Sequence, residues 1–245
     1  MNKYIKYSVT IILAVLIIGI GSAALYYFSV IEKTISDDPL VWEDDITAFE
    51  QNDKTNEIAE NSILFVGSSS IRFWGTLEQD MHPIPVLNRG FGGAKIPDIV
   101  HYLPRIVLPY KPKIIVFYAG DNDMSMGRLH TAKEVLRNYQ AFVSLTQREL
   151  PNTKIFFISI KPSIARWQYW SAMNKANDMI KSYSESDHRL EFIDITGQML
   201  GDDGKPRGDI LIIDGVHMNS KGYDIWTSTI KPIIAKEYEK VVSAK

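Results

Sequence analysis

The residues best suited to chemistry are a run of serines and an aspartate–histidine pair. Ser68, Ser69 and Ser70 directly follow a short apolar run. A serine that opens a helix has its oxygen near free backbone N–H groups, which favour negative charge, although serines there also act as helix caps. Asp214 precedes His217 by three residues. A carboxylate so placed can hold the imidazole in the tautomer whose other nitrogen acts as a base. The pattern permits nucleophilic catalysis by a serine.

Two further segments could hold the negative charge that develops in such a reaction. Residues 88–93 read Asn-Arg-Gly-Phe-Gly-Gly. The glycines allow positive φ angles and close backbone approach, so this loop either cradles an anion or makes a plain tight turn. The second segment is Gly120-Asp121-Asn122-Asp123. The Asn122 amide can donate a hydrogen bond to an oxyanion, or it can form an Asx turn.

The elements that must position these residues alternate between short strands and amphipathic helices. Apolar runs too short for helices predict buried parallel strands at residues 63–66, 86–87, 114–118, 155–160 and 190–193. Helical spacing of apolar residues predicts helices at residues 96–106, 131–150, 171–184 and 220–242. This order indicates a three-layer α/β/α, doubly wound domain with a mostly parallel five-stranded sheet. Ligands bind at the carboxyl ends of strands in such sheets, which is where the four segments lie.

The N-terminus has a different composition. The run from Tyr7 to Ile31 holds 25 residues without a charge, with Lys3 and Lys6 before it and acidic residues after it. As a helix it would measure roughly 37 Å, enough to cross a hydrocarbon core of about 30 Å. We therefore expect residues 1–31 to be a membrane anchor with the rest outside the cytoplasm, or alternatively a cleaved signal segment. Residues 32–60 are expected to form an acidic spacer and lead-in helix, and residues 61–245 the main domain.

Composition excludes several classes of protein. The net charge of −2 lacks the basic excess of nucleic-acid binders, so no nucleic-acid partner is expected. The absence of cysteine excludes disulfide scaffolds, zinc–thiolate sites and cysteine nucleophiles. Charge is unevenly distributed, because residues 31–61 carry ten acids and two bases whereas residues 62–245 carry a net +4. The acidic stretch is expected to be a solvated face.

The four segments together resemble the SGNH hydrolases, also called the GDSL esterase/lipase family, over about residues 61–232. They occur in the family's order, with matching strand and helix spacing. The resemblance implies an SGNH/flavodoxin-like fold and the family's serine esterase activity through a Ser-His-Asp triad and an acyl-enzyme. It implies that Ser69 is the nucleophile, with Asp214 and His217 completing the triad. It also implies an oxyanion hole formed by Ser69, Gly93 and Asn122.

One position departs from the family pattern, because Ser68 stands where the family has aspartate before the nucleophile. That aspartate is not a triad member, so activity is not excluded. The preference for Ser69 over its serine neighbours rests on the resemblance rather than on spacing. A related O-acyltransferase acting on a cell-envelope glycan, and a non-catalytic SGNH-like binding module, remain alternatives. The commoner α/β-hydrolase elbow is disfavoured, since Ile71 occupies the position where G-x-S-x-G needs glycine.

The substrate is expected to be a small-molecule, glycan or lipid ester. Residues that could contact it adjoin the segments above or lie in the aromatic stretch that follows the fourth strand; the candidates are Arg89, Phe91, Asp123, Trp167 and Trp170. Packing against the sheet is the other explanation for the aromatic residues. No cofactor is expected, and no metal, because the hydrolase segments account for Asp121, Asp123, Asp214 and His217.

Overall fold

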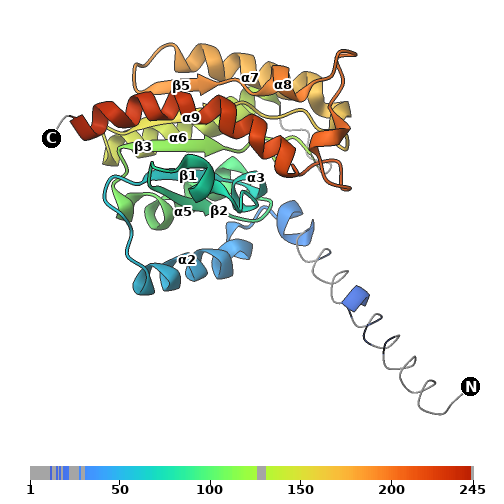
Figure 1. Ribbon diagram of the computed structural model, residues 1–245, viewed down its shortest axis with the longest axis horizontal. Helices are drawn as coiled ribbons and strands as arrows, with labels where there is room; N and C mark the ends of the chain where they lie inside the picture. The colour runs from blue at the N-terminus through green and yellow to red at the C-terminus, as the bar shows by residue number, and fades with distance from the viewer. Residues whose placement is uncertain are drawn as a thin grey trace, which may run out of the picture.

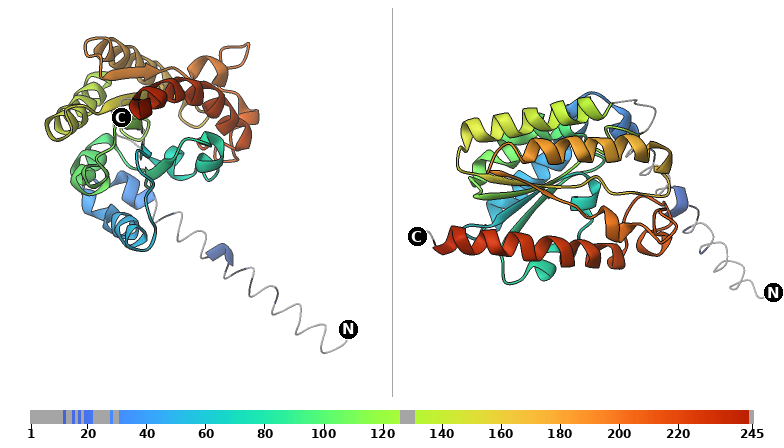
Figure 2. Two further views of the ribbon diagram at one scale, coloured as in Figure 1. Left: turned by 60° about the vertical axis from the view of Figure 1, so that its left-hand side comes forward. Right: turned by 90° about the horizontal axis from the view of Figure 1, so that it is seen from above.

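A computed structural model describes residues 12, 15, 17, 19–21, 28, 31–125 and 131–243. Its centre is a parallel sheet in the order β2-β1-β3-β4-β5. The strands are β1 (Ile63–Gly67), β2 (Val86–Gly90), β3 (Ile114–Tyr118), β4 (Lys154–Ile158) and β5 (Leu190–Ile193). Helices cover both faces (Figures 1 and 2). The predicted three-layer α/β/α fold with a parallel five-stranded sheet is confirmed.

The helices in the described chain follow the predicted order, with additional short turns between them. The α-helices are α2 (Glu43–Thr55), α3 (Ser69–Arg72), α4 (Leu77–Met81), α5 (Ile96–Ile106), α6 (Ala132–Glu149), α7 (Trp170–Ser184), α8 (Thr196–Met199) and α9 (Ser220–Ser243). The 3₁₀ turns are η1 (Pro39–Trp42), η2 (Leu108–Tyr110), η3 (Trp167–Tyr169) and η4 (Gly208–Ile210). α6 begins after Thr131 because the Thr131 hydroxyl and the Glu134 carboxylate form a reciprocal capping box.

The two hydrophobic cores follow from the alternation of side chains along each strand. In β3, Ile115 and Phe117 face a core shared with α5, α6 and α7, whereas Ile114 and Val116 face a core shared with α4 and α9. Both faces of the strand are therefore buried, which explains why its sequence is apolar without interruption. This burial fixes the carboxyl end of the strand, where the candidate site begins.

β2 is longer than its apolar run predicts, since it continues through Asn88 and Arg89 to Gly90. Both polar side chains have partners. Asn88 Nδ2 donates to the Ile71 carbonyl at 2.7 Å, and the Arg89 guanidinium pairs with Asp53 of α2. Polar residues in a buried strand are tolerated when they are hydrogen-bonded in this way.

The acidic stretch after the predicted anchor packs on the domain. Trp42 and Ile46 enter the core beside α5, and Arg105 of α5 pairs with Glu43 at 2.8 Å and Glu50 at 2.7 Å. The negative charge of this stretch thus faces arginines of the positively charged domain. α2 lies within residues 32–60, the predicted acidic spacer and lead-in helix, and it packs against α5.

Within the described residues, no helix is both long and apolar enough to span a membrane. The predicted anchor, residues 1–31, lies mostly outside those residues, and it stays a prediction.

Candidate active site

A cavity of about 530 Å³ lies at the carboxyl edge of the sheet. Residues from several loops line it, including the helical turn of residues 31–35 near the N-terminus. The lining residues are Ile31, Thr34, Ser69, Arg72, Phe73, Gly92, Gly93, Asn122, Ser125, Ala165, Arg166, Gln168, Tyr169, Ile212, Asp214, Val216 and His217. Two other concave regions of similar size, beside α2 and α4, contain none of the proposed catalytic groups.

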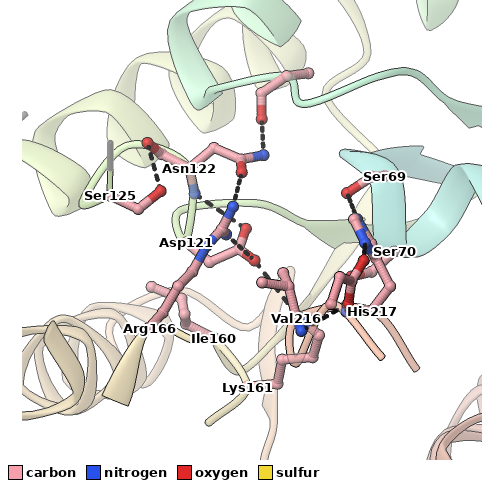
Figure 3. Close-up of polar contacts among 12 residues, drawn as sticks. Ser69, Ser70, Asp121, Asn122, Ser125, Ile160, Lys161, Arg166, Val216 and His217 are labelled. Carbon is pink, nitrogen blue, oxygen red and sulfur yellow. Dashed lines mark hydrogen bonds and ion pairs between the residues drawn. The ribbon is translucent and has the colours of Figure 1, made fainter. Parts of the chain in front are cut away.

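Ser69, His217 and Asp214 form a continuous chain of hydrogen bonds in this cavity. Ser69 Oγ lies 2.8 Å from His217 Nε2, and His217 Nδ1 lies 2.6 Å from Asp214 Oδ2 (Figure 3 shows the serine and histidine). Ser69 opens α3, whereas the hydroxyls of Ser68 and Ser70 are buried and make no hydrogen bond to His217. Geometry therefore separates the three serines, which spacing alone did not.

The Asp214–His217 loop holds its own shape. The second carboxylate oxygen of Asp214 accepts the backbone N–H groups of Val216 at 2.8 Å and His217 at 2.9 Å. Gly215 takes a positive φ of 66°, which a glycine adopts without strain. These local bonds fix the carboxylate so that its remaining oxygen faces the imidazole.

The surroundings of His217 favour its neutral form. Burial is the main cause that lowers the pKa of His217 from 6.5, and the positive charge of Lys161 lowers it further, while the hydrogen bond to Asp214 opposes both. Burial raises the pKa of Asp214, but its hydrogen bonds from His217 and Val216 outweigh that and lower it below the usual value. A neutral imidazole beside an ionised carboxylate is the state that a general base requires.

The three residues that the resemblance to the SGNH hydrolases assigns to an oxyanion hole, Ser69, Gly93 and Asn122, line the same cavity. The backbone N–H groups of Ser69 and Gly93 donate to no acceptor within the described chain. Asn122 Nδ2 donates one hydrogen to the Ala94 carbonyl at 3.1 Å. An amide nitrogen carries two hydrogens, so the second can serve another acceptor.

A buried ionic cluster stands behind Asn122 (Figure 3). Arg166 Nη2 donates to Asn122 Oδ1 at 2.7 Å, and Arg166 Nη1 lies 2.7 Å from Asp121 Oδ2. Lys161 Nζ lies 3.4 Å from the same carboxylate oxygen. Although burial raises the pKa of Asp121, the charges of Arg166 and Lys161 lower it overall. The cluster fixes which end of the Asn122 amide donates, since its oxygen is already occupied.

Three of the candidates for substrate contact, Arg89, Phe91 and Asp123, lie outside the cavity. Arg89 is held by Asp53 and Tyr110, and Phe91 is fully buried beside Trp42. Asp123 is buried and accepts the Ile96 N–H at 3.2 Å at the start of α5. Burial raises its pKa to about 7. None of the three lines the cavity.

Of the aromatic stretch, Tyr169 lines the cavity, whereas Trp167 and Trp170 stack on each other with ring centres 6.0 Å apart. Neither tryptophan lines the cavity. Consecutive residues of a helical turn point in different directions, so an aromatic cluster in the sequence does not show which ring faces the site. In the described chain, no group of three His, Asp or Glu side chains is arranged to hold a metal ion.

Sequence reasoning missed two residues of this site. Arg166 follows a strand end, which was its only signal. Thr34 lies about thirty residues before the main domain, and no sequence signal indicated that it belongs to the site. A Cβ atom built on Gly93 would lie 2.1 Å from Thr34 Oγ1, so Thr34 covers Gly93 directly and leaves no space for a larger residue there.

Comparison with known proteins gives the family. The model of the GDSL-like Lipase/Acylhydrolase family matches residues 55–225. The chain is 27% identical over 169 residues to the platelet-activating factor acetylhydrolase IB subunit alpha2 of Homo sapiens, covering 67% of this chain and 72% of that protein. The alpha1 subunit of Rattus norvegicus is 24% identical over 172 residues, with 67% and 71% covered.

Solved structures show the same fold. A GDSL-like lipase from Bacteroides thetaiotaomicron aligns with a TM-score of 0.65 and 20% identity, over 78% of this chain and 98% of that one. A carbohydrate esterase family 3 protein from Talaromyces cellulolyticus aligns with a TM-score of 0.58 and 18% identity, over 73% and 98%. Because the family model spans more than half of the chain, the protein belongs to the GDSL-like lipase/acylhydrolase family of ester hydrolases.

Proposed function

We propose that the protein is a serine esterase that hydrolyses carboxylic esters of acetyl or longer acyl groups, with Ser69, His217 and Asp214 as its triad. The observation that carries the proposal is the chain of two hydrogen bonds, 2.8 Å and 2.6 Å long, that joins these residues in a cavity. The similarity to an acetylhydrolase and to a carbohydrate esterase supports a search that starts from acetyl esters.

The reaction proceeds in two halves. Ser69 Oγ attacks the ester carbonyl as His217 Nε2 takes the hydroxyl proton, and Asp214 stabilises the imidazolium. The tetrahedral intermediate collapses when the alkoxide leaves with the proton from His217, which gives an acyl-enzyme. Water, deprotonated by the same imidazole, then attacks the acyl-enzyme and releases the carboxylic acid with Ser69 restored.

The oxyanion is stabilised by the N–H groups of Ser69 and Gly93 and by the Asn122 amide. Two observations support this role: the backbone donors have no acceptor within the described chain, and Arg166 occupies the Asn122 oxygen at 2.7 Å. Preorganised donors of this kind are worth about 3 kcal/mol each in the activation barrier. Arg166 is a positioning residue in this mechanism, because it acts on the oxyanion through Asn122.

The test is hydrolysis of p-nitrophenyl esters, from acetate to longer chains, by the detergent-solubilised full chain. Ser69→Ala should abolish turnover and labelling by a fluorophosphonate, while the circular dichroism spectrum stays unchanged. Ser70→Ala is the matched control, since that buried hydroxyl does not reach His217, and it should retain activity. Full activity in Ser69→Ala would disprove the nucleophile assignment.

Two outcomes of the same experiment would favour the alternatives. Failure of the wild-type protein to react with the fluorophosphonate would favour a non-catalytic binding module. Acyl transfer to added sugars in preference to water would favour an O-acyltransferase.

We also propose that residues 1–31 anchor the protein in a membrane with the catalytic domain outside the cytoplasm. The uncharged run from Tyr7 to Ile31 supports this, as do the exposed apolar side chains of Ile12, Val15, Ile17, Ile20 and Phe28. The protein should then stay in the membrane fraction after alkaline extraction, with its domain open to external protease. Release of a shorter chain into the medium would instead indicate a cleaved signal segment.

A further inference from the structure

Exposed apolar side chains are concentrated on the segments that line the catalytic cavity. Within residues 31–125 and 131–243, seven large apolar side chains have more than two-fifths of their surface exposed. Five of the seven either line the cavity or adjoin a lining residue in the sequence: Ile35, Phe73, Ile164, Ile212 and Ile213. We name these five residues the mouth residues.

Much of the surface of the mouth residues is exposed, although Phe73 also packs edge-on against His217 with ring centres 5.0 Å apart. Ile213 is fully exposed, and Ile164 and Phe73 have 52% and 48% of their surface exposed. The remaining two exposed side chains are Leu40 and Val242, and Val242 belongs to the end of α9 at the opposite edge of the molecule (Figure 1). Such a gathering beside one cavity marks an interaction surface rather than the ordinary scatter of apolar residues.

The chain itself indicates what this surface meets. The uncharged run that begins at Tyr7 ends at Ile31, and Ile31 lines the catalytic cavity. Residues 31–37 are tied down beside that cavity: Thr34 covers Gly93, and the Lys95 amine bonds to the Ser36 carbonyl and lies 3.6 Å from the Asp37 carboxylate. An anchor that ends at this wall would hold the cavity mouth at the surface of its own bilayer.

We propose that the mouth residues rest in the outer surface of the membrane, and that the site takes its ester from a lipid or other amphiphile held in that membrane. The inference rests on the proposed esterase function and on the proposed anchor. Ile164, Ile213 and Phe73 enter the boundary between headgroups and acyl chains, as apolar side chains do at bilayer surfaces. The ester then passes into a cavity whose walls include Ile31, Ile212 and Val216 without first crossing water.

The first experiment compares two substrates in one preparation of the full chain reconstituted in phosphatidylcholine vesicles. One substrate is water-soluble p-nitrophenyl acetate, and the other is a fluorogenic long-chain ester held in the bilayer. Ile213→Ser should lower the rate on the bilayer-held ester several-fold and leave the rate on the soluble ester unchanged. Val242→Ser is the matched control, since it removes an exposed apolar side chain at the opposite edge, and it should change neither rate.

The second experiment reads membrane contact without activity. The chain has no cysteine, so Ile213→Cys and Val242→Cys each give one labelling site for an environment-sensitive fluorophore. In vesicles, the label at position 213 should shift to the blue and be quenched by lipids brominated on their acyl chains, and the label at 242 should do neither.

The outcomes separate the possible failures. The membrane contact would be overturned if the label at position 213 emits as it does in water and Ile213→Ser lowers the hydrolysis rates of both esters equally. A blue shift that follows protein concentration rather than lipid would assign the mouth residues to a second copy of the chain, and this too would overturn it. If the wild type hydrolyses neither ester while the label at 213 is quenched by brominated lipid, the esterase function fails and the membrane contact stands.

Discussion

The two walls of the cavity that contains Ser69 and His217 are built in different ways. The Asp214–His217 loop is partly exposed, with 35% and 23% of the two side chains accessible. The Asp214 carboxylate bonds only to residues two and three positions along the chain, and the Ala165 N–H donates to the Gly215 carbonyl at 3.1 Å. The wall that holds Asn122 depends on Asp121, Lys161 and Arg166, which come from the ends of two different strands. Their side chains are 4%, 0% and 13% exposed.

The difference shows which contacts hold the functional side chains of each wall in place. A carboxylate whose hydrogen bonds all come from its own turn depends little on distant side chains for its position. A buried ionic cluster needs every partner, because removal of one charge leaves others buried and uncompensated. We therefore expect substitutions in the loop to change catalysis with little loss of stability, and substitutions in the cluster to change both.

The largest expected loss of activity comes from a substitution in the exposed Asp214–His217 loop. In Asp214→Asn, the backbone bonds to Val216 and His217 can persist, but an amide in place of the carboxylate favours the wrong imidazole tautomer. We expect kcat to fall by about 10³–10⁴-fold, as in other triads, with thermal unfolding nearly unchanged. A fall of several degrees in the thermal unfolding midpoint would contradict this distinction, since it would show that the loop contributes to the stability of the fold.

Asp121→Asn, unlike Asp214→Asn, is expected to lower the stability of the protein. The substitution leaves Lys161 and Arg166 buried without their carboxylate, and such a loss costs about 3 kcal/mol of unfolding free energy. Denaturant unfolding would measure it. Asp209→Asn is the control, because Asp209 pairs with Arg207 on the surface at 2.8 Å and exposed ion pairs contribute little to stability. Equal stability losses in the two variants would contradict the distinction between the walls.

For Asn122→Ala, we expect kcat to fall by about 10²–10³-fold, the usual effect of losing one oxyanion donor. KM should change little, because the donor acts mainly in the transition state. An effect confined to KM would place Asn122 in ground-state binding of the ester instead.

Arg166→Met tests whether the cluster acts through Asn122. We expect kcat to fall by about tenfold in the wild-type background and hardly at all in Asn122→Ala, because coupled residues are not additive. Arg72→Met is the matched control: Arg72 also lines the cavity, but its guanidinium pairs with Asp45 at 3.3 Å. Its effect should be the same in both backgrounds. The same tenfold loss from Arg166→Met in both backgrounds would show that Arg166 acts independently of Asn122.

The smallest expected effect is a shift in the pH dependence of kcat/KM. Only neutral His217 accepts the Ser69 proton, so kcat/KM should fall as the pH drops through the pKa of His217, which lies below 6.5. Lys161→Met removes a positive charge that lowers this pKa, so the acid limb should move to higher pH. No movement would mean that the two walls are electrostatically independent.

Local patterns in the sequence predicted most of the fold and the exposed wall. Short apolar runs predicted the sheet, and the three-residue spacing of Asp214 and His217 predicted a short loop that carries both. The role of Arg166 could not be predicted in this way, because its partners Asp121 and Asn122 are more than forty residues distant in the chain. Phe91 and Arg89 adjoined the site in sequence, yet alternation along an extended chain turned them toward α5 and α2.

The contact between Thr34 and Gly93 bears on how the protein is best produced. The family match begins at residue 55, and a shortened protein that begins at Trp42 would retain Ser69, Asp214, His217 and both cores. It would lose Ile31 and Thr34 from the cavity wall and both partners of the Lys95 amine. Substrate preferences measured on such a protein would describe a cavity without the wall that Ile31 and Thr34 supply, so a shortened protein meant to keep this wall should begin before residue 31.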